Sequence, residues 1–191
     1  PISLVLFTSE PLYVGGEKFR AMRISATYGH GEGVVGAQGI ASDTALLLIS
    51  DAHPDRLYVM YDNKEKPYRL APVSTGKDPS LRAVPNPEEM RSRPVLDRAL
   101  LSRLYALGVI TERFFGDTAT DMEIVIKGET IYPVQARPVN RQPANPSYID
   151  RKKLASSEPS PVIDTFRSDV IIPGKSNVIF INSLEELVIK P

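Results

Sequence analysis

Two carboxylates, an amide and a guanidinium recur at alternate positions between residues 121 and 137. Asp121 and Glu123 are separated by one residue, and so are Gln135 and Arg137. Residues at i and i+2 of a β-strand project to the same face, about 7 Å apart. Carboxylates so placed suit Mg²⁺, which proteins hold with one or two carboxylates and substrate phosphates, and an arginine offers a fixed fork to phosphate oxygens. The simpler alternative, which the pattern alone favours, is a solvated strand face with an ion pair that contributes little.

A hairpin must bring these four side chains together. We expect one over residues 121–137 that turns at 127–130. A three- or five-residue loop centred near Glu129 places Glu123 opposite Gln135 and Asp121 opposite Arg137. The other face of the hairpin is then apolar and belongs to the core. It consists of Met122, Ile124, Ile126, Tyr132, Val134 and Ala136.

A glycine-rich segment over residues 29–36 is a second candidate site. Its last six residues satisfy the G-x-G-x-x-G pattern. The dinucleotide-binding interpretation is rejected, because residues 37–43 are too few for the crossover helix which that fingerprint needs. Two interpretations stay open. The backbone of this loop approaches a phosphate with Glu32 as a carboxylate beside it, or the segment is a flexible surface loop whose glycines permit positive φ.

The rest of the chain predicts an α+β fold that positions these candidates. Apolar and β-branched runs predict strands over 2–8, 19–28, 44–50 and 57–61, with a weaker candidate over 68–73. One long helix is expected between Pro94, which suits a first turn, and Gly116, which suits a C-terminal stop. Its apolar face consists of Leu96, Leu100, Leu104, Leu107 and Phe114, and its other sides carry Asp97, Arg98, Arg103, Glu112 and Arg113.

Composition excludes several classes of function. The 191 residues include 23 basic and 23 acidic residues, so the zero net charge argues against a nucleic-acid-coating protein. The absence of cysteine excludes a disulfide scaffold and a thiolate metal site, and it fits a reducing compartment. No apolar run approaches the ~20 residues that span a bilayer. We therefore expect a cytoplasmic protein with no nucleic-acid or membrane partner.

The C-terminal quarter has a different composition. Residues 141–161 are polar and rich in Pro and Ser, which is typical of a linker. Residues 170–172 and 178–181, with a turn at 173–175, resemble a new β-unit that does not complete. We expect an antiparallel sheet with one long helix in residues 1–140, a linker over 141–161 and an incomplete second domain over 162–191. Both ends of the chain look cut from a longer polypeptide.

Three segments resemble phosphoenolpyruvate synthases (pyruvate, water dikinases) and pyruvate, phosphate dikinases. Residues 24–36, ISATYGHGEGVVG, resemble the glycine-rich segment of these enzymes. Residues 120–123, TDME, resemble their Q-D-I-E, and residues 134–138, VQARP, resemble their L-Q-A-R-P. The motifs occur in the family's order, and the resemblance covers residues 1 to about 140. The Q-A-R-P wording favours the synthase, although related phosphotransferases with the same nucleotide module also use it.

The resemblance implies the C-terminal lobe of an ATP-grasp fold, in which two lobes close on ATP and Mg²⁺. It implies that Asp121 and Glu123 bind the metal, and that these two residues, Gln135 and Glu32 contact the nucleotide. Arg137 would be the catalytic arginine of the same motif. Residues 162–191 would open the swivelling phosphohistidine domain. The implied reaction converts ATP, pyruvate and water into AMP, phosphoenolpyruvate and phosphate through an enzyme phosphohistidine.

The chain departs from the family pattern at several positions. His30 replaces a leucine, Thr120 replaces the glutamine before the acidic pair, and Ser42 replaces the proline of a Pro-Asp pair. The N-terminal ATP-grasp lobe and the segment with the phosphorylated histidine are missing, and neither His30 nor His53 lies in such a segment. We therefore expect this chain alone to be inactive. Two alternatives stay open, namely a related phosphotransferase with another acceptor and a non-catalytic module that kept the lobe.

Overall fold

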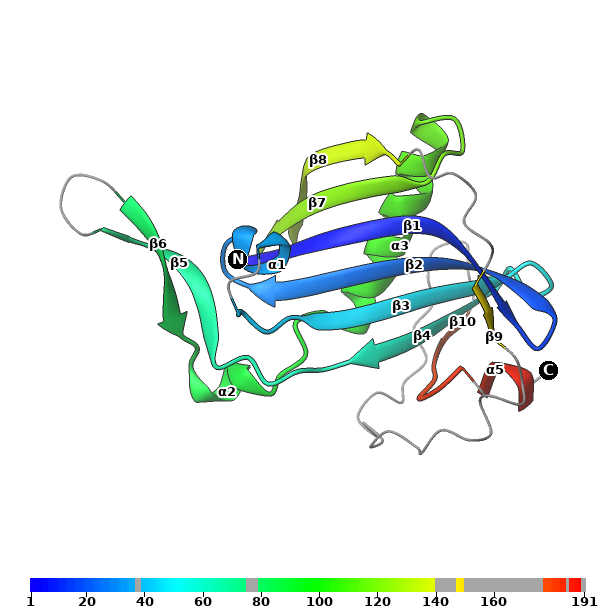
Figure 1. Cartoon of the computed structure of the whole chain (residues 1–191), viewed down its shortest axis with the longest axis horizontal. Coiled ribbons are helices and arrows are strands. Elements are labelled where there is room, and N and C mark those ends of the chain that lie inside the picture. The colour runs from blue at the N-terminus through cyan, green and yellow to red at the C-terminus, as the bar shows by residue number, and fades with distance from the viewer. Residues whose placement is uncertain (37–38, 75–78, 140–146, 150–176, 185, 190–191) are drawn as a thin grey trace.

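The structure is a computed structural model, and it describes residues 1–36, 39–74, 79–139, 147–149, 177–184 and 186–189. In this part of the chain, a large mixed sheet is backed by one long helix, and a two-stranded ribbon projects from one end (Figure 1). The expected α+β class is confirmed. No helix in the described residues is long and apolar enough to cross a membrane.

The strands follow the apolar runs of the sequence. The large sheet contains β1 (Ile2–Val14), β2 (Glu17–Tyr28), β3 (Asp43–Ser50), β4 (Arg56–Asp62), β7 (Thr120–Lys127), β8 (Thr130–Pro138), β9 (Ser147–Ile149) and β10 (Asn177–Phe180). The ribbon contains β5 (Tyr68–Ser74) and β6 (Pro79–Pro85). The helices are α1 (Glu32–Val35), α2 (Glu88–Arg91), α3 (Arg98–Phe114) and α5 (Glu186–Ile189). All five strands predicted before residue 80 are confirmed.

The order of strands across the large sheet is β10-β4-β3-β2-β1-β7-β8, and β9 pairs with β1. The pairs from β4 to β8 are antiparallel, whereas β10 pairs parallel to β4 and β9 pairs parallel to β1. Within residues 1–140 the strands of this sheet pair antiparallel, as expected, and the two parallel pairs are exceptions made by segments beyond residue 140. Both exceptions are short segments from the C-terminal quarter that join strands distant in sequence, which a local pattern cannot predict.

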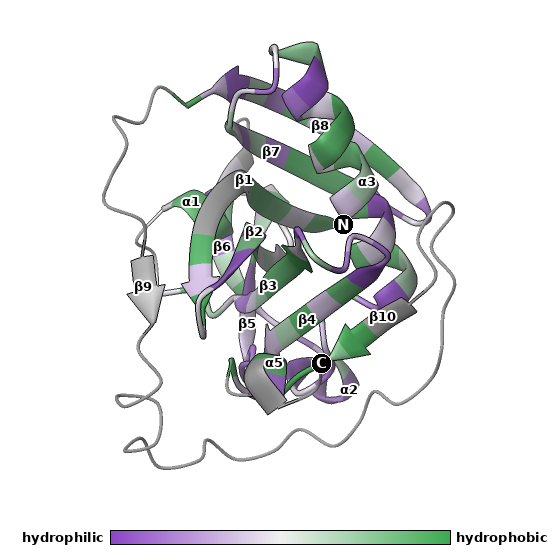
Figure 2. Ribbon diagram, turned by 90° about the vertical axis from the view of Figure 1, so that its right-hand side faces the viewer, coloured by the Kyte–Doolittle hydropathy of each residue, from purple (hydrophilic) through white to green (hydrophobic). Residues whose placement is uncertain are grey.

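The helix α3 packs across one face of the sheet (Figure 1). Polar and apolar residues alternate along the strands, as the striped colouring in Figure 2 shows, and the apolar ones form one core cluster with residues of this helix. The core on this face includes Leu4, Leu6, Met22, Ile24, Leu47, Val59, Met122, Ile124, Leu101 and Leu104. Gly108 permits the close approach of helix and sheet, because a Cβ there would lie 2.9 Å from Met22 Sδ. The opposite face of β1 and β7 is therefore not covered by this helix.

The predicted long helix is present, but its buried face differs from the predicted one. Asp97 caps its N-terminus by accepting a hydrogen bond from Leu100 N at 2.8 Å, and Gly116 adopts φ +68° just beyond its end. Phe114 was expected in the core but is 81% exposed. Arg98 and Glu112 were expected outside but are buried. The buried face follows Leu101, Leu104, Tyr105, Gly108 and Glu112, a 3.6-residue period shifted by about one position from the one expected.

Most of the C-terminal quarter lies outside the described residues, including most of the expected linker and residues 170–175. The strand expected over 178–181 corresponds to β10, which extends the large sheet at its β4 edge. Ile181 and Leu187 are buried in a second core cluster with Phe19 and Tyr58. The described part of this region thus packs on the same sheet, and the division into 1–140, 141–161 and 162–191 stays a prediction.

Candidate functional site

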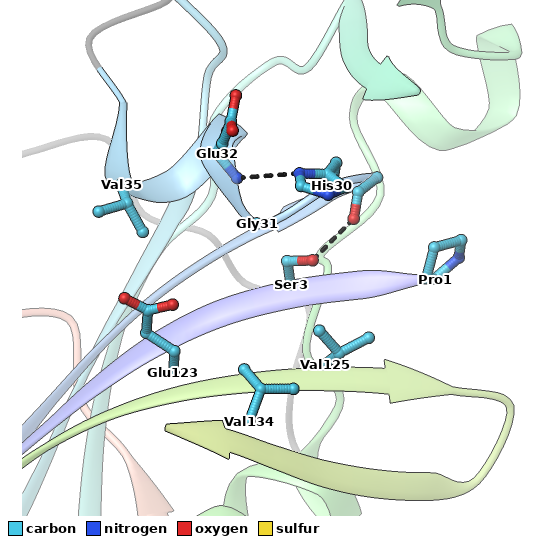
Figure 3. Close-up of a pocket in the computed structure, with 10 residues that line it drawn as sticks. Pro1, Ser3, His30, Gly31, Glu32, Val35, Glu123, Val125 and Val134 are labelled. Atoms are coloured by element: carbon cyan, nitrogen blue, oxygen red, sulfur yellow. Dashed lines mark hydrogen bonds between the residues drawn. The ribbon is translucent and has the colours of Figure 1, made fainter. Parts of the chain in front are cut away.

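A pocket of about 480 Å³ lies on the sheet face opposite α3, where the glycine-rich segment meets the start of β1 and the middle of β7. Figure 3 shows the side chains that line it. Glu32 and Val35 come from α1, Ser3 comes from β1, and Glu123 and Val125 come from β7. The lining residues are Pro1, Ser3, Gly29, His30, Gly31, Glu32, Val35, Glu123, Val125 and Val134. This is the place where the two sequence-predicted candidate sites meet.

The glycine-rich segment is anchored at Gly29. This residue has φ +96°, which favours glycine, and a Cβ here would lie 2.2 Å from the Leu70 carbonyl oxygen. Gly29 N donates to the Pro1 carbonyl at 3.0 Å, and its own carbonyl accepts from Ser3 Oγ at 2.7 Å. The next amide, that of His30, donates to the Leu70 carbonyl at 2.8 Å. The backbone that enters the pocket is therefore fixed between β1 and β5.

Beyond this anchor the segment forms a single helical turn, α1, where the sequence predicted a loop. Gly33 is buried, and its Cα faces Thr27 and Ile40 closely enough that an added Cβ would contact both at 3.4–3.5 Å. Glu32 is exposed at the start of the turn, and Val35 is 61% exposed at its end. The turn thus presents one carboxylate and one apolar side chain to the pocket.

The hairpin of β7 and β8 supplies the opposite wall. Its register is the predicted one, because Glu123 lies opposite Gln135 and Asp121 lies opposite Arg137. The predicted loop length is wrong, since only Gly128 and Glu129 separate the strands. The register is recovered by a bulge between the pairs Glu123–Gln135 and Ile124–Pro133, which leaves Val134 as an extra residue on β8.

The same bulge corrects the expected faces of β8. Met122, Ile124 and Ile126 are buried against α3, as predicted. Tyr132 and Val134 were also expected in the core, but they are 49% and 60% exposed. Ala136 is exposed as well, although it lies outside the bulge and pairs with Met122 as the alternation predicts. One extra residue reverses the alternation of a strand. Tyr132 therefore pairs with Val125 on the Glu123 face, and Val134 lines the pocket.

The five predicted site residues separate into two groups. Glu32 and Glu123 line the pocket together. Asp121, Gln135 and Arg137 do not line it, although all three belong to the same hairpin. Asp121 is 8% exposed, and its Oδ2 accepts hydrogen bonds from Arg137 Nε at 3.0 Å and Arg137 Nη2 at 2.7 Å. The buried carboxylate therefore fixes the guanidinium of Arg137, whose side chain is two-thirds exposed at the edge of the sheet.

The carboxylates fit a magnesium ion only in part. Among the described residues, no group of three or more His, Asp or Glu side chains could hold a metal ion by itself. Glu123 is half-buried and faces the pocket, whereas Asp121 uses one oxygen to orient Arg137. A Mg²⁺ ion that is completed by substrate phosphates requires only one or two carboxylates. The donor set therefore fits a metal that arrives with a phosphate ligand.

A buried polar network holds the neighbouring ribbon in place. Lys66 Nζ donates to Asp43 Oδ1 at 2.6 Å, and neither side chain is exposed. Asp43 also accepts from Tyr61 Oη, Lys64 N and Val95 N at 2.8–2.9 Å. Burial and the nearby Asp43 carboxylate raise the pKa of Tyr61, so its hydroxyl remains a donor. This network connects β3 to the segment that precedes β5. Strand β5 in turn contacts Gly29 and His30 through Leu70.

Sequence reasoning missed several residues of this region. The position of Val125 could have been predicted, because it continues the alternation of Asp121 and Glu123 along β7 and therefore projects to the same face. The position of Val134 could not have been predicted, since the direction of its side chain depends on the bulge. The Asp43–Lys66 pair also carries no local signal, because it joins residues from two separate segments that only the fold brings together.

Comparison with known proteins identifies the family. The family model described as "Pyruvate phosphate dikinase, AMP/ATP-binding domain" matches residues 2–157. The match covers most of the chain, and therefore the chain belongs to this family. It is an ATP-binding part of a phosphotransferase of the pyruvate phosphate dikinase family. No curated protein matches the chain.

Proposed function

We propose that the pocket between α1 and β7 receives the phosphates of ATP. The observation that carries this proposal is the meeting of Glu32 and Glu123 in one pocket, although the two residues belong to separate motifs. Both motifs resemble those of the family to which the chain belongs. The exposed Val35 and Val134 add apolar surface beside the two carboxylates, which is the mixed lining typical of ligand sites.

Each predicted site residue has a distinct part in this proposal. Glu123, together with Asp121, holds Mg²⁺, which supplies charge neutralisation at the phosphates when it is bound. Glu32 faces the same phosphates from α1, and Gln135 offers its amide beside Glu123. Arg137 presents its guanidinium in an orientation that Asp121 fixes, and it stabilises negative charge on the transferred phosphoryl group.

We further propose that this domain belongs to a pyruvate, water dikinase-like enzyme of the cytoplasm. The chain would be the C-terminal lobe of an ATP-grasp domain, and the N-terminal lobe and the phosphohistidine domain of the same polypeptide would be its partners. The phosphoryl group would pass from ATP to a histidine and then to pyruvate. The V-Q-A-R-P wording of residues 134–138 supports this choice over the phosphate-dependent dikinase.

An assay of the longer protein tests the acceptor. We expect ATP to label a histidine, and we expect added pyruvate to discharge the label as phosphoenolpyruvate, with AMP and phosphate as the other products. Added inorganic phosphate should not raise the initial rate. A label that pyruvate does not discharge would contradict the acceptor and leave the nucleotide site standing. A complete lack of labelling would favour the non-catalytic module.

A further inference from the structure

We propose that His30 binds a phosphate group of the nucleotide directly, through its imidazole. This inference rests on the proposed function, because it assigns a further residue to the same pocket. His30 was noted in the sequence only as a departure from the glycine-rich motif. Its position at the pocket gives it a role that the motif does not supply.

The first support is the rigidity of the backbone that carries the imidazole. His30 N donates to the Leu70 carbonyl at 2.8 Å, and the preceding Gly29 is held by hydrogen bonds to Pro1 and Ser3. The His30 side chain is nevertheless exposed, and it lines the pocket together with Glu32 and Glu123 (Figure 3). A fixed main chain with an accessible side chain is the arrangement that a ligand-binding residue needs.

The second support is the state of the ring. Glu32 N donates to His30 Nδ1 at 3.4 Å, so Nδ1 acts as an acceptor in this conformation. A neutral imidazole that accepts at one nitrogen carries its proton on the other. The geometry therefore assigns the Nε2–H tautomer to His30. Its proton is available to an acceptor such as a phosphate oxygen.

The third support is the charge of the pocket. His30 is the one side chain among the described lining residues that carries an N–H group. Glu32 on α1 and Glu123 on β7 are acidic, and the guanidinium of Arg69 on β5 donates to the Pro85 carbonyl and the Asn86 side chain. The two carboxylates repel a triphosphate that arrives without enough cation. An imidazole N–H that donates to a phosphate oxygen offsets part of this repulsion.

The test uses the two histidines of the chain as site and control. His53 lies in the turn between β3 and β4 and is not among the residues that line the pocket. The dissociation constant of Mg-ATP is measured by NMR for the wild type, His30→Leu and His53→Leu. Leucine removes the imidazole N–H and supplies no donor in its place. We expect His30→Leu to bind Mg-ATP about threefold or more weakly than the wild type, and His53→Leu to bind it like the wild type.

The imidazole resonances give a second readout, which does not depend on how the variants fold. In the wild type, Mg-ATP should shift the His30 ring resonances and leave those of His53 unchanged, and Mg²⁺ alone should shift neither. Shifts of Glu32 and Val125 without a shift of His30, or an unchanged affinity in His30→Leu, would overturn this inference while the proposed function stands. A shift of His30 with Mg²⁺ alone would make it a metal ligand and also overturn it. A lack of any shift in the pocket would overturn the proposed function itself.

Discussion

Replacing Glu123 by glutamine in the longer enzyme is expected to lower ATP-dependent histidine phosphorylation by at least about a hundredfold. Glutamine keeps the size of the side chain but removes the negative charge that anchors a phosphate-bound metal. Glu123 is half-buried and faces the pocket, so the variant should fold normally. The rate of label transfer from ATP, measured together with the thermal unfolding of each protein, checks this expectation.

The matched control is Glu129→Gln. Glu129 lies in the turn of the same hairpin and is exposed. It should label at the wild-type rate, and pyruvate binding should be unchanged in both variants, because the resemblance places that site in another domain. Undiminished labelling in Glu123→Gln would contradict the metal assignment. Asp121→Asn should also abolish labelling, because it both weakens the metal site and releases Arg137 from its two hydrogen bonds.

Replacing Lys66 by methionine is expected to destabilise the chain by about 3–5 kcal/mol. Lys66 and Asp43 are both fully buried, so methionine would leave the Asp43 carboxylate without its cation in a site closed to water. A loss of this size lowers the melting temperature by about 6–20 °C in a chain of this length. Thermal and urea unfolding measure it.

Lys64→Met is the control for the buried pair. The Lys64 ammonium pairs with Asp62 at 2.8 Å, but both side chains are more than half exposed. Its loss should cost less than about 1 kcal/mol. The Lys64 backbone groups that contact Asp43 and Lys66 are unchanged by this substitution. Equal stability of the two variants would show that the buried pair does not hold the ribbon in place.

The sequence predicts the local features of this fold well. The turn at Gly15 and Gly16, both with positive φ, joins two long apolar strands whose alternation is clear. The cross-strand partners of Asp121 and Glu123 are the predicted ones, although the loop has two residues and a bulge restores the register. The end of α3 follows from Gly116, whereas the helix begins at Arg98 after the Asp97 cap and not in a turn at Pro94.

The features that the sequence does not predict depend on three-dimensional packing. The bulge at Val134 turns Tyr132 and Val134 outward, and no residue type in β8 marks it. Glu112 reads as a surface residue, but it is buried and lies 3.5 Å from Arg20. The pocket itself depends on the crossing of β5 over Gly29, which joins segments about forty residues apart along the chain. The sequence motifs thus indicate the candidate ligand-binding residues, whereas the fold determines which of them lie together in one pocket.

An NMR titration of this chain with Mg-ATP tests the central claim most directly. We expect weak binding, with a dissociation constant of about 1 mM or more, because the triphosphate is held from one side and each charge interaction is screened by water. The amide resonances that shift should belong to residues 29–35 on the glycine-rich side and to residues 123–125 and 134 on the hairpin side. Shifts confined to another surface, such as the exposed end of α3 at Phe114, would contradict the assignment of the pocket between α1 and β7 as the nucleotide site.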